Sequence, residues 1–408
     1  MTEPIALVKA SARLNSGEAW QDFCAVLARA GHMIDRFPDA SDLERAEWYR
    51  WLSRLVRIGA ERFIENCEPN RPRLKEIPWR CTANVTMPTQ DHYLLEFDTP
   101  TEFVIRGHRG SAPYFVFAAW SAKQPADLGA RSWANASYDS LREFDPAILN
   151  TTAFLSSDEI RFDEDGHFEL RLSLHEQPGN WLALRDDSVG VLLRVVHHDR
   201  RTETPPTLTI ERAEPTTTPI PVTPADVSAG LAKAAQWVLG YTELVRSWWW
   251  DNLGQRPNRL RFSRATYLSN GGVPDRHFAF GAWEKPAGSA LVVEFNPPDC
   301  EAWIYQLCNI WHENLDCYEE EQGYVTRETA ATASDGTVRI VIADHDPGIG
   351  GNWVDSYGHE RGVWGLRLIK TDSTPRVRVW LVPLPELHER GLGALESHSA
   401  IETGEFTD

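Results

Sequence analysis

The sequence predicts a mainly β fold with helical additions, organised as two related β-rich units that are each preceded by helices. Three observations predict it. The phrase HEQPGNW at 175–181 returns as HDPGIGGNW at 345–353. In both halves the apolar residues change from helical spacing to alternation with a period of two, which is typical of strands. The length of 408 residues also exceeds what one hydrophobic core usually serves.

The first half begins with a helical segment, which we place at residues 1–80. Ser16 precedes one stretch with helical spacing, and the letters FPDASD precede a second. The apolar positions are Trp20, Phe23, Leu27 and Ile34 in the first stretch and Trp48, Leu52, Leu55 and Phe63 in the second. Alternating stretches such as HYLLEF and YFVFAAW follow, so residues 81–213 are predicted to form the first β unit.

A segment rich in proline and threonine, residues 214–226, is predicted to be an interdomain linker. Thr223, Pro224 and Asp226 are typical of an N-cap, a first helical residue and an acid in the first turn. Residues 227–262 are therefore predicted to be helical. They include three tryptophans, 248–250, which we interpret as the wall of a pocket or of a domain interface. Residues 263–390 are predicted to form the second β unit, and the tail at 391–408 to be disordered.

The repeated phrase belongs to a longer internal alignment. Two pairs are separated by 170 residues and a third by 172: Gly166 with Gly336, His175 with His345, and Asn180 with Asn352. An Asp-Gly pair precedes the strand in each copy and supplies the positive φ that a tight turn needs. We interpret the two phrases as the same loop of a duplicated unit, between one long strand and the next.

The composition argues against several classes of function. A net charge of −18 opposes binding to nucleic-acid phosphates or anionic lipid, so neither partner is expected. The N-terminus lacks the apolar stretch of a secretory signal and no segment suits a membrane span, so a cytoplasmic location is expected. The six cysteines have no metal or redox spacing and are interpreted as buried free thiols. No nucleotide-binding spacing occurs, and we expect no cofactor and no metal.

The stretch DGTVRIVIADHDPGIGGNWVDSYGHERGVWGLRLIK at 335–370, with EAWIYQLCN upstream, resembles the bacterial family called domain of unknown function 1214. The resemblance covers most of the second half and rests on the Asp335-Gly336 turn, Pro347, Asn352-Trp353 and the closing Leu366-Arg367-Leu368. The first half is similar to the amino-terminal part of longer actinobacterial members through YRWLSRL, IRGHRG and PGNWLAL, whereas NVTMPTQDHY departs from the family pattern. The resemblance implies jelly-roll-like β-sandwiches with helical additions, and no established activity.

The loop at 343–362 holds the densest collection of acid–base side chains. A carboxylate that orients an imidazole can move protons near neutral pH, so His345 is predicted to be a general base with Asp346 or Glu360 as its partner. The further candidates are Asp344 and His359 for acid–base chemistry, and Asp355 and Arg361 for substrate binding. The competing interpretation is a solvated loop whose charged residues stabilise turns.

An asparagine and a tryptophan close each repeated phrase, and they suggest carbohydrate binding. An indole stacks on the face of a sugar, while an amide bonds its hydroxyls. The substrate-binding candidates are Asn180, Trp181, His175, Asn352, Trp353, Trp311 and His312. The alternative is structural, with the tryptophan closing a sandwich edge and the asparagine bonding local backbone. Presence in both copies favours the structural alternative, because a catalytic device rarely needs duplicating.

The leading functional hypothesis is an intracellular hydrolase or lyase without a cofactor, acting on a hydroxylated small molecule or a glycoside. It requires that His345, Asp346 and Glu360 come within hydrogen-bond reach of one another. The alternatives are a non-catalytic module that binds a ligand or a protein, and a structural subunit of a complex. The sequence does not predict an oligomeric state.

Overall fold

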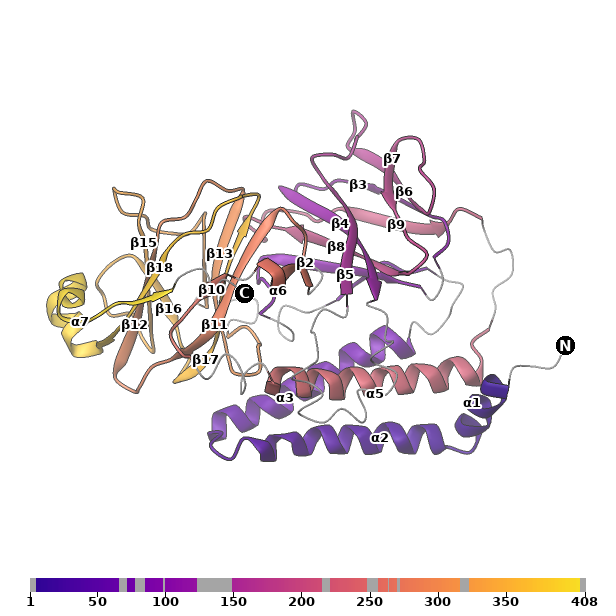
Figure 1. The fold of residues 1–408 in the computed structure, drawn as a ribbon, viewed down its shortest axis with the longest axis horizontal. Helices are drawn as coiled ribbons and strands as arrows, with labels where there is room; N and C mark the ends of the chain where they lie inside the picture. The colour runs from indigo at the N-terminus through magenta and orange to yellow at the C-terminus, as the bar shows by residue number, and fades with distance from the viewer. Residues whose placement is uncertain are drawn as a thin grey trace. The chain divides into compact units, whose positions relative to one another are not determined.

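The structure is a computed structural model that describes residues 5–65, 72–77, 85–97, 100–122, 149–214, 221–247, 256–262, 264–269, 272–315 and 323–403. The chain forms two compact units. One comprises Met1–Pro78 and Asp91–Ser247, and the other comprises Trp79–Gln90 and Trp248–Asp408. Each unit contains two β-sheets, which confirms the predicted mainly β fold with two β-sandwich units (Figure 1). No helix among the described residues is long and apolar enough to cross a membrane.

The first unit has a layer of helices that lie against one another (Figure 1). They are α1 (Ile5–Asn15), α2 (Glu18–Gly31), η1 (His32–Arg36), α3 (Asp42–Gly59), η2 (Ala60–Ile64) and α5 (Pro224–Ser247). A capping box begins α3: the Ser41 hydroxyl accepts from the Glu44 N–H, and the Glu44 carboxylate accepts from the Ser41 N–H. Trp48 and Trp51 of α3 are buried in this layer.

Helix α5 begins as the sequence predicts but belongs to the first unit. Asp226 N donates to Thr223 Oγ1 at 3.2 Å, and the Asp226 carboxylate accepts from Thr223 N at 2.8 Å. The helix packs against α1, α2 and α3. At Gly59 an added β-carbon would lie 3.3 Å from the carbonyl oxygen of Ala234 in α5, so a larger residue there would crowd α5. The sequence prediction that this helix opens the second unit is therefore wrong. The apolar face of α5 is visible in the sequence, but it does not indicate which helices the face packs against. The three tryptophans at 248–250 lie outside the described residues.

The first unit packs two sheets face to face. Its strands are β1 (Lys75–Glu76), β2 (Gln90–Glu96), β3 (Phe103–His108), β4 (Tyr114–Ala122), β5 (Leu149–Ser156), β6 (His167–Ser173), β7 (Asn180–Ala183), β8 (Ser188–Val196) and β9 (Thr207–Arg212). One sheet has the order β1-β2-β8-β4-β5 and the other β7-β6-β3-β9. Apolar side chains from both sheets, such as Phe115, Val191 and Leu170, share one core.

The second unit repeats this arrangement. Its strands are β10 (Arg261–Phe262), β11 (Arg276–Glu284), β12 (Ser289–Phe295), β13 (Ala302–Cys308), β14 (Tyr324–Thr326), β15 (Val338–Ala343), β16 (Asn352–Asp355), β17 (Arg361–Ile369), β18 (Val377–Pro383) and β19 (Ile401–Thr403), with the short helix α6 (Arg264–Ser269). The sheet orders are β10-β11-β17-β13-β14 and β16-β15-β12-β18-β19. Apart from β19, every strand has a counterpart nine numbers earlier with the same neighbours, so the predicted duplication is confirmed by topology.

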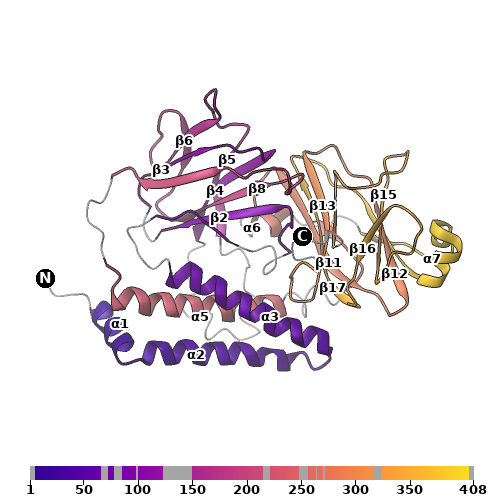
Figure 2. The same ribbon diagram turned by 180° about the vertical axis from the view of Figure 1, so that it is seen from behind.

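The core of the second sandwich contains Trp283, Trp303 and Trp364. The helices α7 (Leu384–Arg390) and η6 (Gly391–Ser397) contact β18. Figure 2 shows α7 at one end of the second unit, next to the strands of its sandwich. The two helices bury Leu387 and Ala394 in a second apolar cluster. The predicted disordered tail is therefore wrong for 391–403, where β19 pairs with β18. A few apolar residues among many polar ones were enough to fold this segment. The predicted helical segment also ended too late, since β10 occupies 261–262.

A short segment from the first half completes the second unit. The carbonyl oxygen of Thr86 accepts from Gln306 Nε2 at 3.0 Å and from Asn314 Nδ2 at 2.7 Å. Gln90 Oε1 accepts from Arg276 Nη1 at 3.2 Å. The chain thus contributes residues 85–90 to the second unit and α5, which follows the linker, to the first.

Cleavage at a protease site placed within residues 215–220 is expected to leave the two fragments associated. Helix α5 of the later fragment packs against helices of the earlier one, and Thr86 of the earlier fragment bonds to Gln306 and Asn314 of the later one. Size-exclusion chromatography of the cleaved protein under native conditions measures this. Elution as two separate fragments would contradict the assignment of residues 85–90 to the second unit and of α5 to the first.

Candidate functional site

Asn352 and Trp353 of the second repeated phrase bond to backbone. Asn352 Nδ2 donates to the carbonyl oxygens of Ala331 at 2.9 Å and Arg339 at 2.8 Å, and its Oδ1 accepts from Ala331 N at 2.7 Å. Trp353 Nε1 donates to the carbonyl oxygen of Ala343 at 3.1 Å. These bonds tie the short strand β16 to β15 and to the segment before it.

The first repeated phrase makes the same bonds. Asn180 Nδ2 donates to the carbonyl oxygens of Arg161 and Glu169, both at 3.0 Å, and its Oδ1 accepts from Arg161 N at 2.8 Å. Trp181 Nε1 donates to the carbonyl oxygen of Ser173 at 3.3 Å, and also to Ser173 Oγ at 3.0 Å. Both asparagine side chains thus have the local backbone contacts of the structural alternative, which accounts for their presence in both copies.

The structure does not join the predicted catalytic trio. His345 is exposed, and its ring lies 6.1 Å from that of His388 at an interplanar angle of 18°. Asp346 Oδ1 accepts from Gly348 N at 2.8 Å, which turns the carboxylate back onto its own loop. Glu360 is exposed. Within the described residues no hydrogen bond or ion pair connects His345 with Asp346 or with Glu360.

Trp311 and His312 lie in a buried turn after β13. Asn309 Oδ1 accepts from the N–H groups of Trp311 at 3.0 Å and Glu313 at 3.1 Å. His312 has a φ of 66°, and burial lowers its pKa to about 3. A neutral, enclosed imidazole is suited to packing rather than to contact with a dissolved substrate. His175, by contrast, is exposed, and its carbonyl oxygen accepts from Ser173 Oγ at 2.6 Å.

A polar cluster closes one end of the second sandwich. Lys285 follows β11, Asp344 follows β15, and Asp355 with Ser356 ends β16. Lys285 has a fully buried side chain, and its Nζ donates to Asp344 Oδ1 at 3.0 Å. The Ser356 hydroxyl donates to the same oxygen. The Asp344 side chain is 39% exposed, so this carboxylate joins the interior to the surface.

The two carboxyl groups of this cluster have pKa values that move in opposite directions. Burial raises the pKa of Asp344, but hydrogen bonds from Ser356 and Lys285 and the lysine charge outweigh it, and the pKa lies below its ordinary value. Burial raises the pKa of Asp355, the negative charge of Asp344 adds to that rise, and a 2.7 Å bond from the Tyr357 N–H opposes it. A pair separated in this way can hold one proton at a pH where the other group is ionised.

Two further candidates support the loop. His359 is buried, and its Nδ1 lies 2.9 Å from the carbonyl oxygen of Ser356. Arg361 begins β17, where it is paired in register with Glu284. The backbone N–H of Lys285 donates to the carbonyl oxygen of Glu360 at 2.7 Å, so these strand ends fix the lysine in place.

The first unit is apolar at the positions of this cluster. The backbone identifies the equivalents, because Leu184 N donates to the carbonyl oxygen of Ser173 at 2.9 Å as Ser356 N does to that of Ala343 at 3.2 Å. The equivalent pairs are Leu174 with Asp344, Ala183 with Asp355, and Leu184 with Ser356. At these three positions one copy therefore has apolar residues, whereas the other has two acids and a serine.

The sequence prediction missed Lys285 and Ser356. Alternate residues of a strand share a face, and Lys285 continues the face of Ala279 and Trp283, which point into the core. That alternation was visible in the sequence and placed a lysine at the inner edge of the sandwich. Ser356 had no comparable signal, because its position depends on the parallel pairing of β15 and β16.

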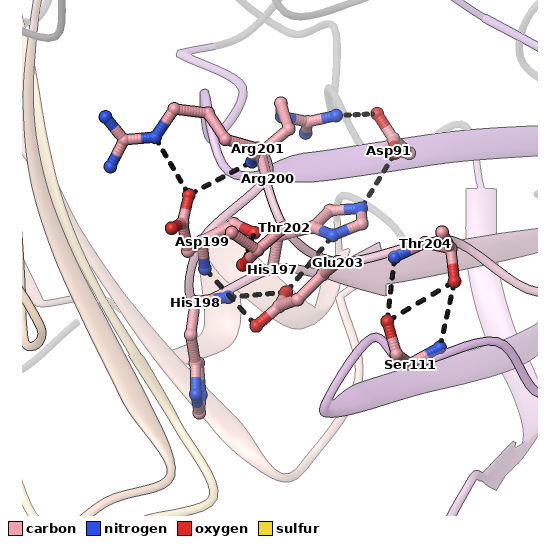
Figure 3. A network of polar contacts seen from close by, with 10 residues as sticks. All are labelled: Asp91, Ser111, His197, His198, Asp199, Arg200, Arg201, Thr202, Glu203 and Thr204. Carbon is pink, nitrogen blue, oxygen red and sulfur yellow. Dashed lines mark hydrogen bonds and ion pairs between the residues drawn. The ribbon is translucent and has the colours of Figure 1, made fainter.

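A second polar network lies in the first unit (Figure 3). His197 Nε2 lies 2.9 Å from Asp91 Oδ2, its Nδ1 lies 3.3 Å from Glu203 Oε2, and Arg200 Nη1 donates to Asp91 Oδ1 at 2.6 Å. Burial raises the pKa of Asp91, but the bonds from His197 and Arg200 hold it well below its usual range. The network connects β2 to the loop after β8, and we assign it a structural role.

Three of the six cysteines, Cys24, Cys300 and Cys308, lie among the described residues, and Cys67, Cys81 and Cys317 lie outside them. Cys300 and Cys308 are buried free thiols, and burial raises their pKa values to about 11 and about 12. Cys24 is also free but exposed, contrary to the expectation of burial. In the part of the chain that the structure describes, no group of three or more His, Cys, Asp or Glu side chains could hold a metal ion.

Replacing either repeated asparagine with alanine is expected to destabilise the protein similarly. Asn352→Ala and Asn180→Ala each leave a backbone N–H and two carbonyl groups without their amide partner, which costs about 1 to 3 kcal/mol. Urea unfolding followed by tryptophan fluorescence measures it. A change below about 0.5 kcal/mol in both variants would show that the amides do not stabilise the fold.

Asp91→Asn is expected to lower the free energy of unfolding at neutral pH by about 3 kcal/mol, because it removes one charge of a buried group. A carboxyl with a depressed pKa stabilises the folded state above its unfolded pKa, about 3.9, and loses that contribution as the pH falls toward the folded value. Stability should thus decline more steeply below pH 4 in the wild type than in the variant. If the free energies of unfolding of the wild type and the variant, measured against pH, fell in parallel below pH 4, the lowered pKa of Asp91 would be contradicted.

Comparison with known proteins identifies relatives by structure. No family model matches the chain, and no curated protein matches it. The crystal structure of an uncharacterized protein from Burkholderia cenocepacia has a TM-score of 0.80 and 30% identity, over 92% of this chain and 99% of that one. A crystal structure of a protein from Vibrio parahaemolyticus has a TM-score of 0.42 and 10% identity, over 80% and 95% of the two chains. The chain belongs to the same family as the uncharacterized protein of Burkholderia cenocepacia.

Proposed function

We propose that Asp344 and Asp355 form an acid–base site in the second sandwich, and that the protein is a hydrolase or lyase. One observation carries the proposal. Lys285 and Ser356 hold Asp344 directly after Ala343, the residue that is paired with Asp355 in the adjacent strand, and the duplicated unit has Leu174 and Ala183 at these two positions. The pKa values of the two carboxyls also move in opposite directions. Groups whose environments separate their pKa values are typical of acid–base pairs in enzymes. His345, Asp346 and Glu360 are not the core of this proposal, because the structure does not join them.

In hydrolysis, one carboxyl would act as the general acid and the other as the general base. Asp355, which keeps its proton to higher pH, donates that proton to the leaving oxygen as the bond from carbon to that oxygen breaks. Asp344, held ionised, accepts a proton from the attacking water as the new bond from carbon to oxygen forms. The proton then returns from Asp344 to Asp355 through solvent.

The chemistry of the surroundings supports a hydroxylated small molecule or a glycoside as substrate. Carboxylates accept hydrogen bonds from hydroxyl groups, and the exposed acids Asp346 and Glu360 on the same loop disfavour an anionic substrate. The proposal includes an intracellular location and kinship with the domain of unknown function 1214 family, both of which rest on sequence alone.

The proposal predicts a ligand whose binding depends on Asp344 and Asp355. In a thermal-shift screen of oligosaccharides and polyols, a compound that binds is expected to stabilise the wild type, by about 2.7 kcal/mol at a hundredfold excess over its Kd. Asp344→Leu, which introduces the residue of the first unit, should lose the shift. Glu176→Gln, which changes an exposed acid in the equivalent loop of the first unit, is the matched control and should keep it.

Turnover of the compounds that bind decides between an enzyme and a binding module. Asp355→Asn is expected to lower kcat by about 10² to 10⁴, because it removes the proton donor. The wild-type rate should fall as pH rises through the raised pKa of Asp355 and as pH falls through the lowered pKa of Asp344. Binding without turnover would favour the non-catalytic module. Neither binding nor turnover would remove the site and leave a structural subunit.

A further inference from the structure

We propose that Lys285 is the positioning residue of this site: its ammonium group keeps Asp344 as the ionised member of the pair and thereby leaves the proton to Asp355. This inference rests on the proposed function for its catalytic meaning, although the assignment of charge can be tested by itself. Lys285 lies outside the loop at 343–362 and does not reach the surface, so it acts through Asp344.

The interior faces of three strands converge on the ammonium group. The residues that continue these faces beyond the core are Lys285 after Trp283, Asp344 after Ile342, and Ser356 after Val354. Lys285 Nζ and the Ser356 hydroxyl both donate to Asp344 Oδ1. The carboxylate is thus fixed through one oxygen. A bound molecule would meet the side chain through its exposed part.

Stability alone does not account for a lysine in this place. Removing an ammonium group from water costs several kcal/mol, and exchanging a buried ion pair for apolar residues is often neutral or stabilising. The first unit has no carboxylate at the position of Asp344, which Leu174 occupies, and Leu184 is buried where Ser356 stands. The second unit retains the charged pair despite this alternative, which favours a role in the site.

The charged groups around the pair explain the order of proton binding. The groups that act on Asp344 are Lys285, with which it forms an ion pair, and His345. Those that act on Asp355 are Asp344, which raises its pKa, and Lys285 and His345, which lower it. Lys285 acts on Asp344 through both charge and a hydrogen bond, but on Asp355 through charge alone. Its net effect therefore separates the two carboxyls.

Titration of aspartate side-chain carboxyl carbons by NMR in the full chain tests the proposal. In Lys285→Met, which keeps a long apolar side chain, the midpoint of Asp344 should rise by about one to three pH units. In Lys285→Arg, which keeps the cation, it should stay closer to the wild type. In Ser356→Ala, the matched loss of the other donor, the charge remains and Asp344 should still titrate before Asp355.

The outcomes separate a positioning role from a structural one. An Asp344 midpoint in Lys285→Met within about 0.3 pH units of the wild type would overturn the proposal, since the charge of Lys285 then has no effect on Asp344. If the Met variant does not fold, Lys285→Gln keeps a donor without the charge, and the same criterion applies to it. A shifted midpoint in a protein without ligand or turnover would uphold the role of Lys285 and refute the proposed function instead.

Discussion

The parallel pairing of a very short strand with a long one is the constraint on which the rest of the structure depends. β16 has four residues and pairs with β15 along Ile340↔Asn352 to Ala343↔Asp355. Such a short strand has little area to bury, so side-chain bonds must define its register. The Asn352 amide bonds to Arg339 in β15 and to Ala331. A slip by one residue would turn Asp355 inward and Ser356 outward, and the polar cluster would not form.

The duplicated unit shows which features belong to the fold and which were added to it. The bonds from the Asn180 and Asn352 amides to the backbone, and those from the Trp181 and Trp353 indole N–H groups, occur in both copies, so they are requirements of the architecture. The carboxylates at the positions of Asp344 and Asp355 occur in one copy, so the architecture does not require them. Function commonly resides in sites placed on a fold rather than in the fold itself. The internal duplicate therefore serves as a comparison in which the backbone is the same and the chemistry differs.

Much of the fold could be predicted because its signals are local. The Asp-Gly turns have a φ of 84° at both Gly166 and Gly336, and the Thr223 cap begins its helix. What could not be predicted depends on partners distant in sequence. Nothing near α5 indicates that it packs against α1 to α3, and nothing near Thr86 indicates Gln306. The candidate site shows the same division. The loop at 343–362 could be identified from its own residues, whereas Lys285 follows β11, which is distant in sequence. The prediction that His345, Asp346 and Glu360 form a trio did not take account of the turn in which the Asp346 carboxylate bonds to its own loop.

The early segment at 85–90 has a consequence for synthesis of the protein. Its bonding partners Gln306 and Asn314 lie 220 and 228 residues later in the chain. At about 5 to 20 residues per second, a ribosome takes roughly 10 to 45 seconds to supply them. During that interval the segment lacks the strands that cover it, and all strands of the first sandwich, of which β9 is the last, are made before those partners. In the nascent chain, the carbonyl group of Thr86 therefore lacks its two amide partners until the second sandwich has been synthesised.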